Sequence, residues 1–364
     1  MKTTIKFGVI GTSAVTKLVH LPGLQSHPNA KITAICGRNQ ERAQEVAKEY
    51  DIPKVYSDYR EMIEKAGIDA VVIVTPNNLH YPMIMDALEA KLHVLCEKPL
   101  ALNLKQAKEV CEKADAAGVK HMAFFNLRWD PNYRYFKELV DAGYVGRLFN
   151  CYLHWITGEN LKRDQYHWRS DKASNKGALW GSCSPIIDLA HLFFGDIDKV
   201  SASLSTFMPL PPPQGQTYEP ADDSAALSVR FKNGAHGTLY GSKVVHLGRY
   251  HLSIRASGEK GILESDAWNL IGEKKPEMRG AQTSEKEVSK LEVPNRYWEG
   301  VDRTKSQFER FLELFTKQSS GERLFVDSIY NDKMVSPNFY DCLKVQRVIH
   351  AAEEADKTGK WVSV

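Results

Sequence analysis

The sequence lacks the features of a membrane-spanning or exported chain. No apolar run approaches the about 18–20 residues that a helix needs to cross a bilayer. The first residues lead straight into a strand-like run, without the apolar stretch of a signal peptide. The six cysteines are scattered, and none form a C-x-x-C pair. These absences predict a cytoplasmic protein with reduced, mostly buried thiols.

An excess of one charge is also missing. The chain has 48 Lys plus Arg against 45 Asp plus Glu, a net charge of +3, and no long basic run. This balance argues against a nucleic-acid-binding protein. No His, Cys and carboxylate spacing typical of a metal site is present, so no metal is expected. A chain of 364 residues predicts two domains.

Strands and helices alternate through the first 125 residues. Asn39 and Asn103 are expected to cap two of the helices, and the first helix is expected to end near Gln25. This alternation predicts βαβ units and a parallel sheet. The predicted strands are Ile5–Ile10, Lys31–Cys36, Val71–Val74, Leu92–Cys96 and Lys120–Phe125.

The pattern changes after about residue 126. Helices are expected over Tyr133–Ala142 and Asn338–Lys357, and a loop over residues 209–220. Asn233-Gly234 predicts a hairpin between two strands, so this half is expected to hold a mostly antiparallel sheet. Its predicted strands are Leu148–Trp155, Lys199–Thr206, Ser224–Phe231, Ala235–Val244 and Tyr250–Ala256.

The turn after the first strand carries part of a dinucleotide-binding pattern. It reads Gly11-x-Ser13-x-x-Thr16, between a strand and a helix, where a pyrophosphate meets a helix N-terminus. Gly11 allows the tight turn, and the Ser13 hydroxyl could donate to a phosphate. An ordinary strand-to-helix turn is the alternative, but the surrounding βαβ pattern favours nucleotide binding.

The end of the second strand bears on the choice of cofactor. An acidic residue there would bind the ribose 2′-hydroxyl of NAD. The chain has Cys36-Gly37-Arg38-Asn39 instead, and Arg38 could pair with a 2′-phosphate. We therefore expect NADP or NAD as cofactor, with NADP favoured. The alternative is that Arg38 is a solvated residue at the start of a helix.

Several motifs occur in order across nearly the whole chain. They are Gly8-Val9-Ile10-Gly11-Thr12 with His20-Leu21-Pro22, Thr75-Pro76-Asn77-Asn78-Leu79-His80, Cys96-Glu97-Lys98-Pro99-Leu100, Asn126-Leu127-Arg128-Trp129-Asp130-Pro131, Gly143-Tyr144-Val145-Gly146, Trp168-Arg169 and Gly177-Ala178-Leu179. Together they resemble the glucose-fructose oxidoreductase / inositol dehydrogenase / rhizopine catabolism (Gfo/Idh/MocA) family of NAD(P)-dependent oxidoreductases. The resemblance implies an α/β protein. Its N-terminal Rossmann domain would span residues 1–125, and its C-terminal α/β domain, built on a mostly antiparallel open sheet, residues 126–364.

The resemblance also implies the site residues and partners. It places Lys98 at the nicotinamide and the substrate, where a cation would stabilise a developing alkoxide. It further implies a carbohydrate-like substrate and a homodimer or homotetramer, with neither nucleic acid nor membrane as a partner. The residues expected to bind the cofactor are Gly11, Thr12, Ser13, Ala14, Val15, Gly37, Arg38, Thr75, Pro76, Asn78, His80, Glu97, Lys98, Asn126, Trp168 and Arg169.

The chain departs from the family in the helix that carries the acid–base residues. That helix reads Gly-Ala-Leu-x-Asp-x-Gly-x-His-x-x-Asp in the family, with the histidine as general base. Here Gly181 replaces the first Asp and Pro185 replaces the His, while Asp188 is retained. Proline cannot transfer a proton. The candidates for catalysis are therefore Lys98, Asp188 and His191, with His167 and His154 as further alternatives.

Three functions remain open at this point. The leading hypothesis is hydride transfer between a nicotinamide cofactor and a hydroxyl or carbonyl of a sugar, cyclitol or sugar derivative. The alternatives are a cofactor-binding pseudoenzyme and an NAD-assisted glycoside hydrolase or lyase, because the family's Asp and His are replaced. The side chains expected to contact a sugar, unless they pack in the core, are Trp129, Trp155, Trp168, Trp180, Arg128, Arg169 and Asp188.

Overall fold

The computed structural model describes residues 4–364 except 213, 247–250, 267–268 and 275–288. The described chain forms two compact units. The first, here called the Rossmann unit, comprises Met1–Trp129 and Trp298–Gln346. The second, the sheet unit, comprises Asp130–Tyr297 and Arg347–Val364. The predicted division placed residues 298–346 in the C-terminal domain, whereas in the structure they pack with the N-terminal unit.

The Rossmann unit is built on a parallel sheet, as predicted. Among the described residues its strand order is β3-β2-β1-β4-β5-β6, the order of a doubly wound dinucleotide-binding fold. The strands are β1 Ile5–Ile10, β2 Ala30–Cys36, β3 Lys54–Tyr56, β4 Ala70–Ile73, β5 His93–Glu97 and β6 His121–Phe124. The sequence therefore predicted every strand but the short β3.

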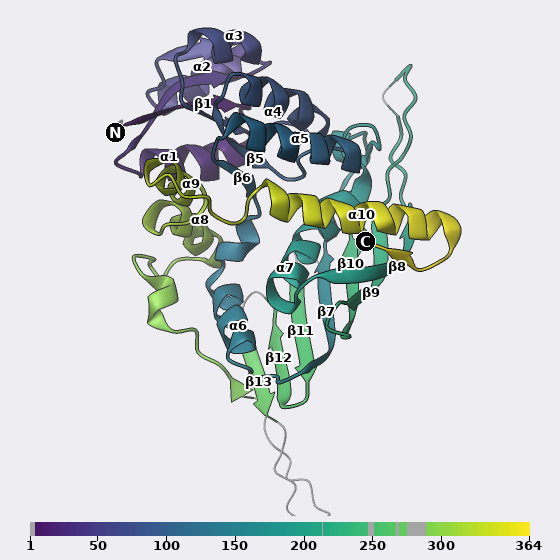
Figure 1. Cartoon of the computed structure of the whole chain (residues 1–364). Coiled ribbons are helices and arrows are strands. Elements are labelled where there is room, and N and C mark those ends of the chain that lie inside the picture. The colour runs from purple at the N-terminus through teal and green to yellow at the C-terminus, as the bar shows by residue number, and fades with distance from the viewer. Residues whose placement is uncertain (1–3, 213, 247–250, 267–268, 275–288) are drawn as a thin grey trace, which may run out of the picture. The chain divides into compact units, whose positions relative to one another are not determined.

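Helices cover both faces of this sheet. Phe7 and Val9 belong to one buried cluster with residues of α1, α8 and α9. These three helices lie together beside the sheet (Figure 1). Gly8 points the opposite way, because a Cβ on it would lie 2.8 Å from Ile68 Cδ1 and 2.9 Å from Met62 Cε, beside α3. The helices of this unit are α1 Leu21–Gln25, α2 Gln40–Glu49, α3 Tyr59–Lys65, α4 His80–Glu89, α5 Leu104–Ala117, α8 Gln307–Lys317 and α9 Gly321–Tyr330.

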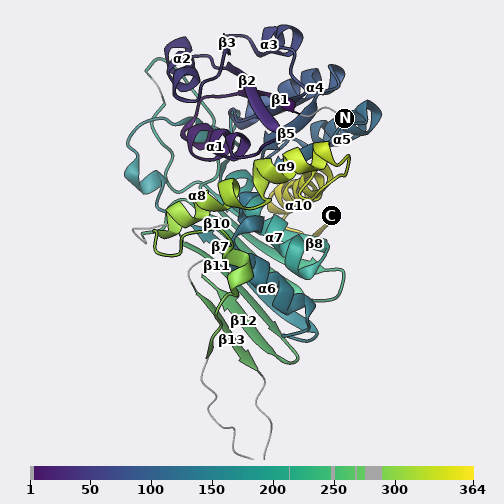
Figure 2. The same cartoon turned by 90° about the vertical axis from the view of Figure 1, so that its left-hand side faces the viewer.

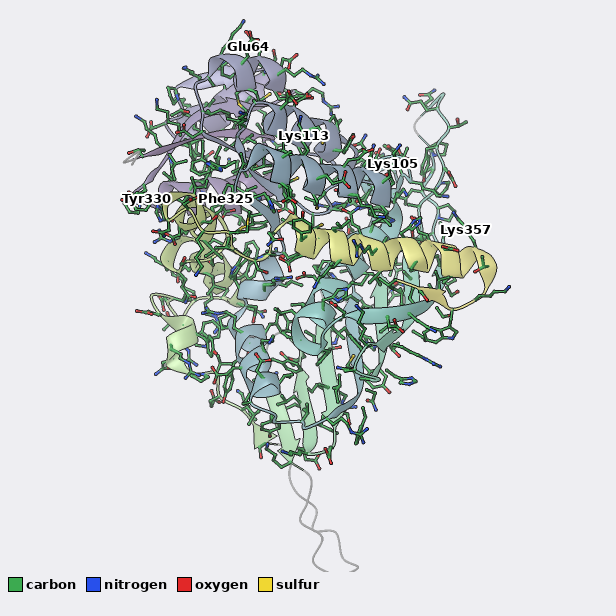
Figure 3. The ribbon with its side chains drawn as sticks, in the orientation of Figure 1. Glu64, Lys105, Lys113, Phe325, Tyr330 and Lys357 are labelled. Carbon is green, nitrogen blue, oxygen red and sulfur yellow. The ribbon has the colours of Figure 1, made fainter. Side chains whose placement is uncertain are left out.

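Two late helices complete the core of the Rossmann unit. The ring of Phe315 on α8 lies 5.6 Å from that of Phe124, and the ring of Phe325 on α9 lies 6.3 Å from that of Phe7. Phe325 is buried, whereas Tyr330 at the end of the same helix is exposed (Figure 3). The apolar faces of α8 and α9 thus explain why the chain returns to its first unit.

The sheet unit carries the predicted, mostly antiparallel sheet. Its order among the described residues is β14-β13-β12-β11-β7-β10-β9-β8-β15, and the β7–β10 pair is parallel. Gly234, with φ +88°, lies in the predicted hairpin between β9 and β10. Two predicted positions, Tyr250 in a strand and Pro213 in the proline-rich loop, lie outside the described residues. The strands are β7 Leu148–Ile156, β8 Ile197–Ser205, β9 Ser224–Phe231, β10 His236–Ser242, β11 His251–Gly258, β12 Gly261–Ser265, β13 Leu270–Lys274, β14 Ser289–Lys290 and β15 Val362–Ser363.

One face of this sheet is covered by α6 (Pro131–Asp141) and α7 (Ser184–Phe194), as Figure 2 shows. Along β7, Cys151 and Leu153 are buried, whereas Tyr152 between them is exposed. This alternation identifies one covered and one open face.

The last helix, α10 (Phe339–Thr358), begins in the Rossmann unit and ends in the sheet unit. All six cysteines are buried. No helix of the described residues is both long and apolar enough to cross a membrane.

Candidate active site

The predicted cofactor residues of the Rossmann unit gather at one edge of its sheet. Gly11 follows β1, Gly37 follows β2, Thr75 follows β4, Lys98 follows β5 and Asn126 follows β6. Because the strands are parallel, their carboxyl ends lie along the same edge, where open α/β sheets bind ligands. The crevice of such a sheet lies between β1 and β4, where the strand order reverses.

The turn after β1 fits a dinucleotide. Gly11 has φ +116°, and a Cβ on it would lie 2.2 Å from the carbonyl oxygen of Val74. A Cβ on Gly37 would lie 2.8 Å from Cγ2 of Thr12. The first turn of the helix at residues 14–25 follows at once, and its N–H groups have no partner within the helix. Thr12 to Val15 are therefore placed to hold a pyrophosphate.

Ser13 has a structural role that the glycine pattern did not predict. Its Oγ accepts a hydrogen bond from the Thr16 N–H at 3.2 Å, and its own N–H donates to Thr16 Oγ1 at 3.2 Å. This reciprocal pair resembles a capping box in which Thr16 takes the place of the usual Glu or Gln at the third helical position. It also explains why a buried threonine replaces the usual small residue at position 16.

His80 holds two loops of the cofactor edge together. Its side chain is fully buried, with Nδ1 2.6 Å from the Pro99 carbonyl and Nε2 2.9 Å from the Thr75 carbonyl. Burial lowers the pKa of His80. The prediction that His80 itself binds the cofactor therefore needs correction, because its ring has no surface open to a ligand. It connects the Thr75 loop to the segment that follows Lys98.

Lys98 stands next to a buried ionic network. Its neighbour Glu97 lies 3.2 Å from Nε2 of His20, and Nδ1 of His20 lies 2.5 Å from Oε1 of Glu322 on α9. His20 and Glu322 are fully buried. Although burial opposes protonation, the two carboxylates raise the pKa of His20 to about 9. The network anchors the end of β5, and therefore the backbone that carries Lys98.

Arg38 is exposed and directly follows Gly37, which packs on the turn after β1. Arg38→Ala is expected to weaken NADP binding relative to NAD by at least about tenfold, the scale of a charge-assisted hydrogen bond to a phosphate. Titration of both cofactors measures the ratio. Arg42→Ala removes an exposed arginine one turn further along α2 and serves as the control. An unchanged ratio would show that Arg38 does not select the cofactor.

In the sheet unit, the helix with the altered motif begins against Asp222. The carboxylate of Asp222 accepts from the Leu179 N–H at 2.7 Å, and its carbonyl accepts from the Ala178 N–H at 2.8 Å. Residues Leu179–Cys183 form a π-helical turn before α7. Pro185 has no N–H to give to the carbonyl of Gly181, which accounts for the wider turn.

The predicted residues Trp168 and Arg169 lie in the same unit, on the 3₁₀ turn Trp168–Ser170. The guanidinium of Arg169 stacks 5.3 Å from the Trp168 ring and lies 3.3 Å from Glu159, which also pairs with Arg163 at 2.7 Å. Lys243, at the end of β10, donates to the Arg169 carbonyl at 3.3 Å. Lys243 has no local sequence signal, and sequence reasoning missed it.

Other predicted residues are placed away from this cluster. Asp188 is buried in α7, and His191 lies about 15 Å further along the helix than Gly181, beside Asp196. His154 packs on Tyr240, on the sheet face opposite α7.

Three side chains expected to contact a sugar are engaged within their own units. Trp129 packs in the Rossmann core, and Trp180 is buried with its Nε1 donating to Glu353. Arg128 is paired with Ser336 and Asp341. These three are therefore structural residues, and the prediction that they contact a sugar needs correction.

Comparisons with known proteins agree with this architecture. Residues 5–125 match the model of an oxidoreductase family with an NAD-binding Rossmann fold, and residues 133–264 match that of the GFO/IDH/MocA C-terminal domain. An uncharacterized oxidoreductase of Synechocystis sp. is 32% identical over 72% of this chain and 71% of that protein. Myo-inositol 2-dehydrogenase of Thermotoga maritima is 29% identical, over 72% of this chain and 75% of that protein's length.

Among solved structures, levoglucosan dehydrogenase in complex with NADH is similar, with a TM-score of 0.88. The similarity covers 99% of both chains at 24% identity, and it supports the fold. The two matched regions and the shared topology together lead to one assignment. The chain belongs to the Gfo/Idh/MocA family of NAD-binding oxidoreductases.

Proposed function

We propose that this chain transfers a hydride between a nicotinamide dinucleotide and a hydroxyl or carbonyl of a sugar or cyclitol. The observation that carries the proposal is Lys98 at the carboxyl end of β5, on the edge that holds the dinucleotide turn. Relatives named as myo-inositol and levoglucosan dehydrogenases support a polyhydroxylated substrate.

Each unit, taken by itself, holds side chains that suit part of this chemistry. When bound, the nicotinamide supplies the hydride acceptor or donor. Lys98 would orient the carbinol oxygen and stabilise the negative charge that develops on it. In the sheet unit, Arg169 and the partly exposed Trp168 offer a cation and an aromatic face, which suit the hydroxyls and the C–H face of a sugar.

The test is a screen of sugars, cyclitols and anhydrosugars with NAD and NADP, followed by the absorbance of the reduced nicotinamide. Cofactor reduction with one substrate class supports the proposal. Substrate conversion without net reduction would favour the NAD-assisted hydrolase or lyase. Tight cofactor binding without conversion of any substrate would favour the pseudoenzyme, which the loss of the Asp and His at 181 and 185 motivates.

We also propose a homodimer or homotetramer formed through the open face of the nine described strands of the sheet unit. Tyr152 on β7 is exposed there, and Trp361 near the C-terminus stacks 5.1 Å from the Arg230 guanidinium. Light scattering is expected to give at least twice the mass of one chain. Tyr152→Glu should shift the mass toward one chain, with Phe308→Glu, an exposed aromatic of the Rossmann unit, as control. A wild-type monomer would contradict the proposal.

A further inference from the structure

Lys243 of the sheet unit is a buried lysine that forms no ion pair with the residues that the structure describes. It directly follows β10 and is 4% exposed. Its Nζ donates to the Arg169 carbonyl at 3.3 Å, the one hydrogen bond of this ammonium group among the described residues. A lysine ammonium has three N–H donors, so two remain for other acceptors. Because a buried charge without a counter-ion is costly, the position favours a bound anion.

The side chain of Lys243 ends beside Gly181, in the π-helical turn before α7. A Cβ on Gly181 would lie 3.7 Å from Lys243 Nζ and 3.8 Å from Asn175 Nδ2. From residue 177 to residue 190, a stretch that the structure describes throughout, Gly181 is the one residue that is not buried. Two nitrogen donors from separate segments of the sheet unit therefore meet at one partly exposed position, where a ligand oxygen can approach both.

The nearest charged side chains leave this position positive. Glu159 is the carboxylate that acts most strongly on Lys243, but its Oε1 is shared by Arg163 at 2.7 Å and Arg169 at 3.3 Å. One carboxylate thus serves two arginines, and Lys243 adds a third cation. Burial and these same three cations lower the pKa of His167 to about 4. A sugar hydroxyl would accept from the two donors, whereas a carboxylate would also balance the charge.

Two further carboxylates near Lys243 are held by backbone N–H groups. Asp222 accepts from the Leu179 N–H at 2.7 Å. Asp223 accepts from the Met208 N–H at 2.7 Å. Both attract the ammonium group of Lys243 without forming an ion pair with it. Since Coulomb attraction falls with distance, a carboxylate in contact with Nζ would be bound more strongly than either.

We propose that the sheet unit binds a sugar acid through its carboxylate, which Lys243 and Asn175 hold beside Gly181. The inference rests on the proposed function for the choice of a sugar, whereas the carboxylate site rests on contacts within the sheet unit. Gly181 stands where the family has an aspartate. A carboxylate on the chain at this position would compete for the same donors, so its loss makes room for the carboxylate of the ligand.

The first test compares sugar acids with their neutral counterparts. D-glucuronate, D-galacturonate and D-gluconate are titrated into the full chain, with and without NAD, alongside D-glucose, D-galactose and D-glucitol. At least one acid is expected to bind at least about tenfold more tightly than its counterpart, the scale of a charge-assisted hydrogen bond. NMR shift changes give the affinities, so the comparison needs no turnover.

The first variant is Lys243→Met, which keeps the length of the side chain and removes its charge. Its affinity for the preferred acid should fall at least about tenfold, while its affinity for the neutral counterpart stays within about twofold. Lys176→Met is the matched control, because Lys176 precedes the same helix and pairs with Glu353 at 3.4 Å. Circular dichroism checks that each variant is folded.

The lysine itself provides a second measurement. The NMR signal of its ε-carbon, assigned by its loss in Lys243→Met, reports the pKa of Lys243. The bound acid should raise this pKa by at least about one pH unit, because it places a negative charge beside the ammonium group. The neutral counterpart should leave it unchanged. The charged groups that already act on Lys243 are Glu159, Asp222, Arg169 and Asp223.

A second pair of variants keeps the lysine. Gly181→Asp attaches a carboxylate beside Nζ, and Gly181→Asn adds a side chain of the same size without the charge. Both side chains can begin at Gly181, because a Cβ there would meet Nζ at 3.7 Å, an ordinary contact distance. The affinity for the acid should be at least about tenfold lower in Gly181→Asp than in Gly181→Asn, since the attached carboxylate takes the donors and repels the ligand.

The outcomes separate the two proposals. If the wild type binds no acid more tightly than its counterpart, the sugar-acid site is wrong and hydride transfer still stands. Near-wild-type affinity of Lys243→Met for the acid, an unmoved lysine pKa, or equal affinities of the Gly181 pair also overturn the site. An acid that binds as expected but reacts with neither NAD nor NADP supports the site and contradicts the proposed function. If Lys243→Met does not fold, the Gly181 pair decides.

Discussion

Replacing Lys98 with alanine is expected to lower turnover by at least about 10²-fold while cofactor affinity changes little. Lys98 follows β5 at the edge of the parallel sheet, where its ammonium group can stabilise a developing alkoxide. This interaction is stronger in the transition state than in the bound substrate, so its loss should appear in kcat more than in cofactor binding. Steady-state kinetics and a separate cofactor titration measure the two quantities.

The control for this experiment is Lys105→Ala. Lys105 lies on the outer face of α5, with its side chain 88% exposed (Figure 3). Removing it takes away the same charge from the same unit without touching the sheet edge. Near-normal turnover of Lys98→Ala would show that Lys98 is not a catalytic residue. A parallel loss in both variants would indicate a long-range charge effect.

Glu322→Ala is expected to destabilise the Rossmann unit by about 3–5 kcal/mol, because it removes one partner of a buried ion pair. His20 would keep its buried position with one carboxylate fewer. The exposed pair Glu61 and Lys65, at 3.1 Å, provides the control. Glu61→Ala should cost no more than about 1 kcal/mol, as surface pairs do. Urea titration with hydrogen exchange at β1 measures the stability of this unit.

The loss of stability in Glu322→Ala is expected to depend on pH. The folded pKa of His20, about 9, lies above the unfolded value near 6.5. The stability from His20 is therefore fully present below about pH 6.5 and is lost as pH rises through about 9. The stability difference between wild type and Glu322→Ala should shrink over that range. A difference that stays constant from about pH 6.5 to 9.5 would contradict a charged His20.

Local signals in the sequence predicted much of the fold. Asn39 and Asn103 cap α2 and α5, accepting from the N–H groups of Arg42 and Gln106 at 2.9 Å, as expected. Continuous apolar runs predicted the buried parallel strands, because both faces of that sheet are covered. Both predictions depend only on residues close in the sequence. A helix cap bonds an N–H a few residues away, and an apolar run is read from consecutive residues.

The missed features depend on contacts between distant segments. The capping box of Ser306 and Glu309 marks the start of α8, but no local pattern says that its apolar face packs on Phe124. The loss of the acid–base residues was visible in the motif at Gly181. Lys243, whose Nζ would lie 3.7 Å from a Cβ on Gly181, follows β10. Its burial depends on contacts with distant segments, so its neighbours in the sequence do not indicate it.

The return of α8 and α9 to the Rossmann unit has a consequence for how the protein is made. During synthesis the N-terminal part of a chain usually folds first. Here Phe7 and Phe124 find their partners Phe325 and Phe315 after most of the chain has left the ribosome. Until then an apolar surface of the nascent sheet remains open to solvent, or to a chaperone. A fragment that ends near residue 129 would carry the dinucleotide turn and still lack part of its own core.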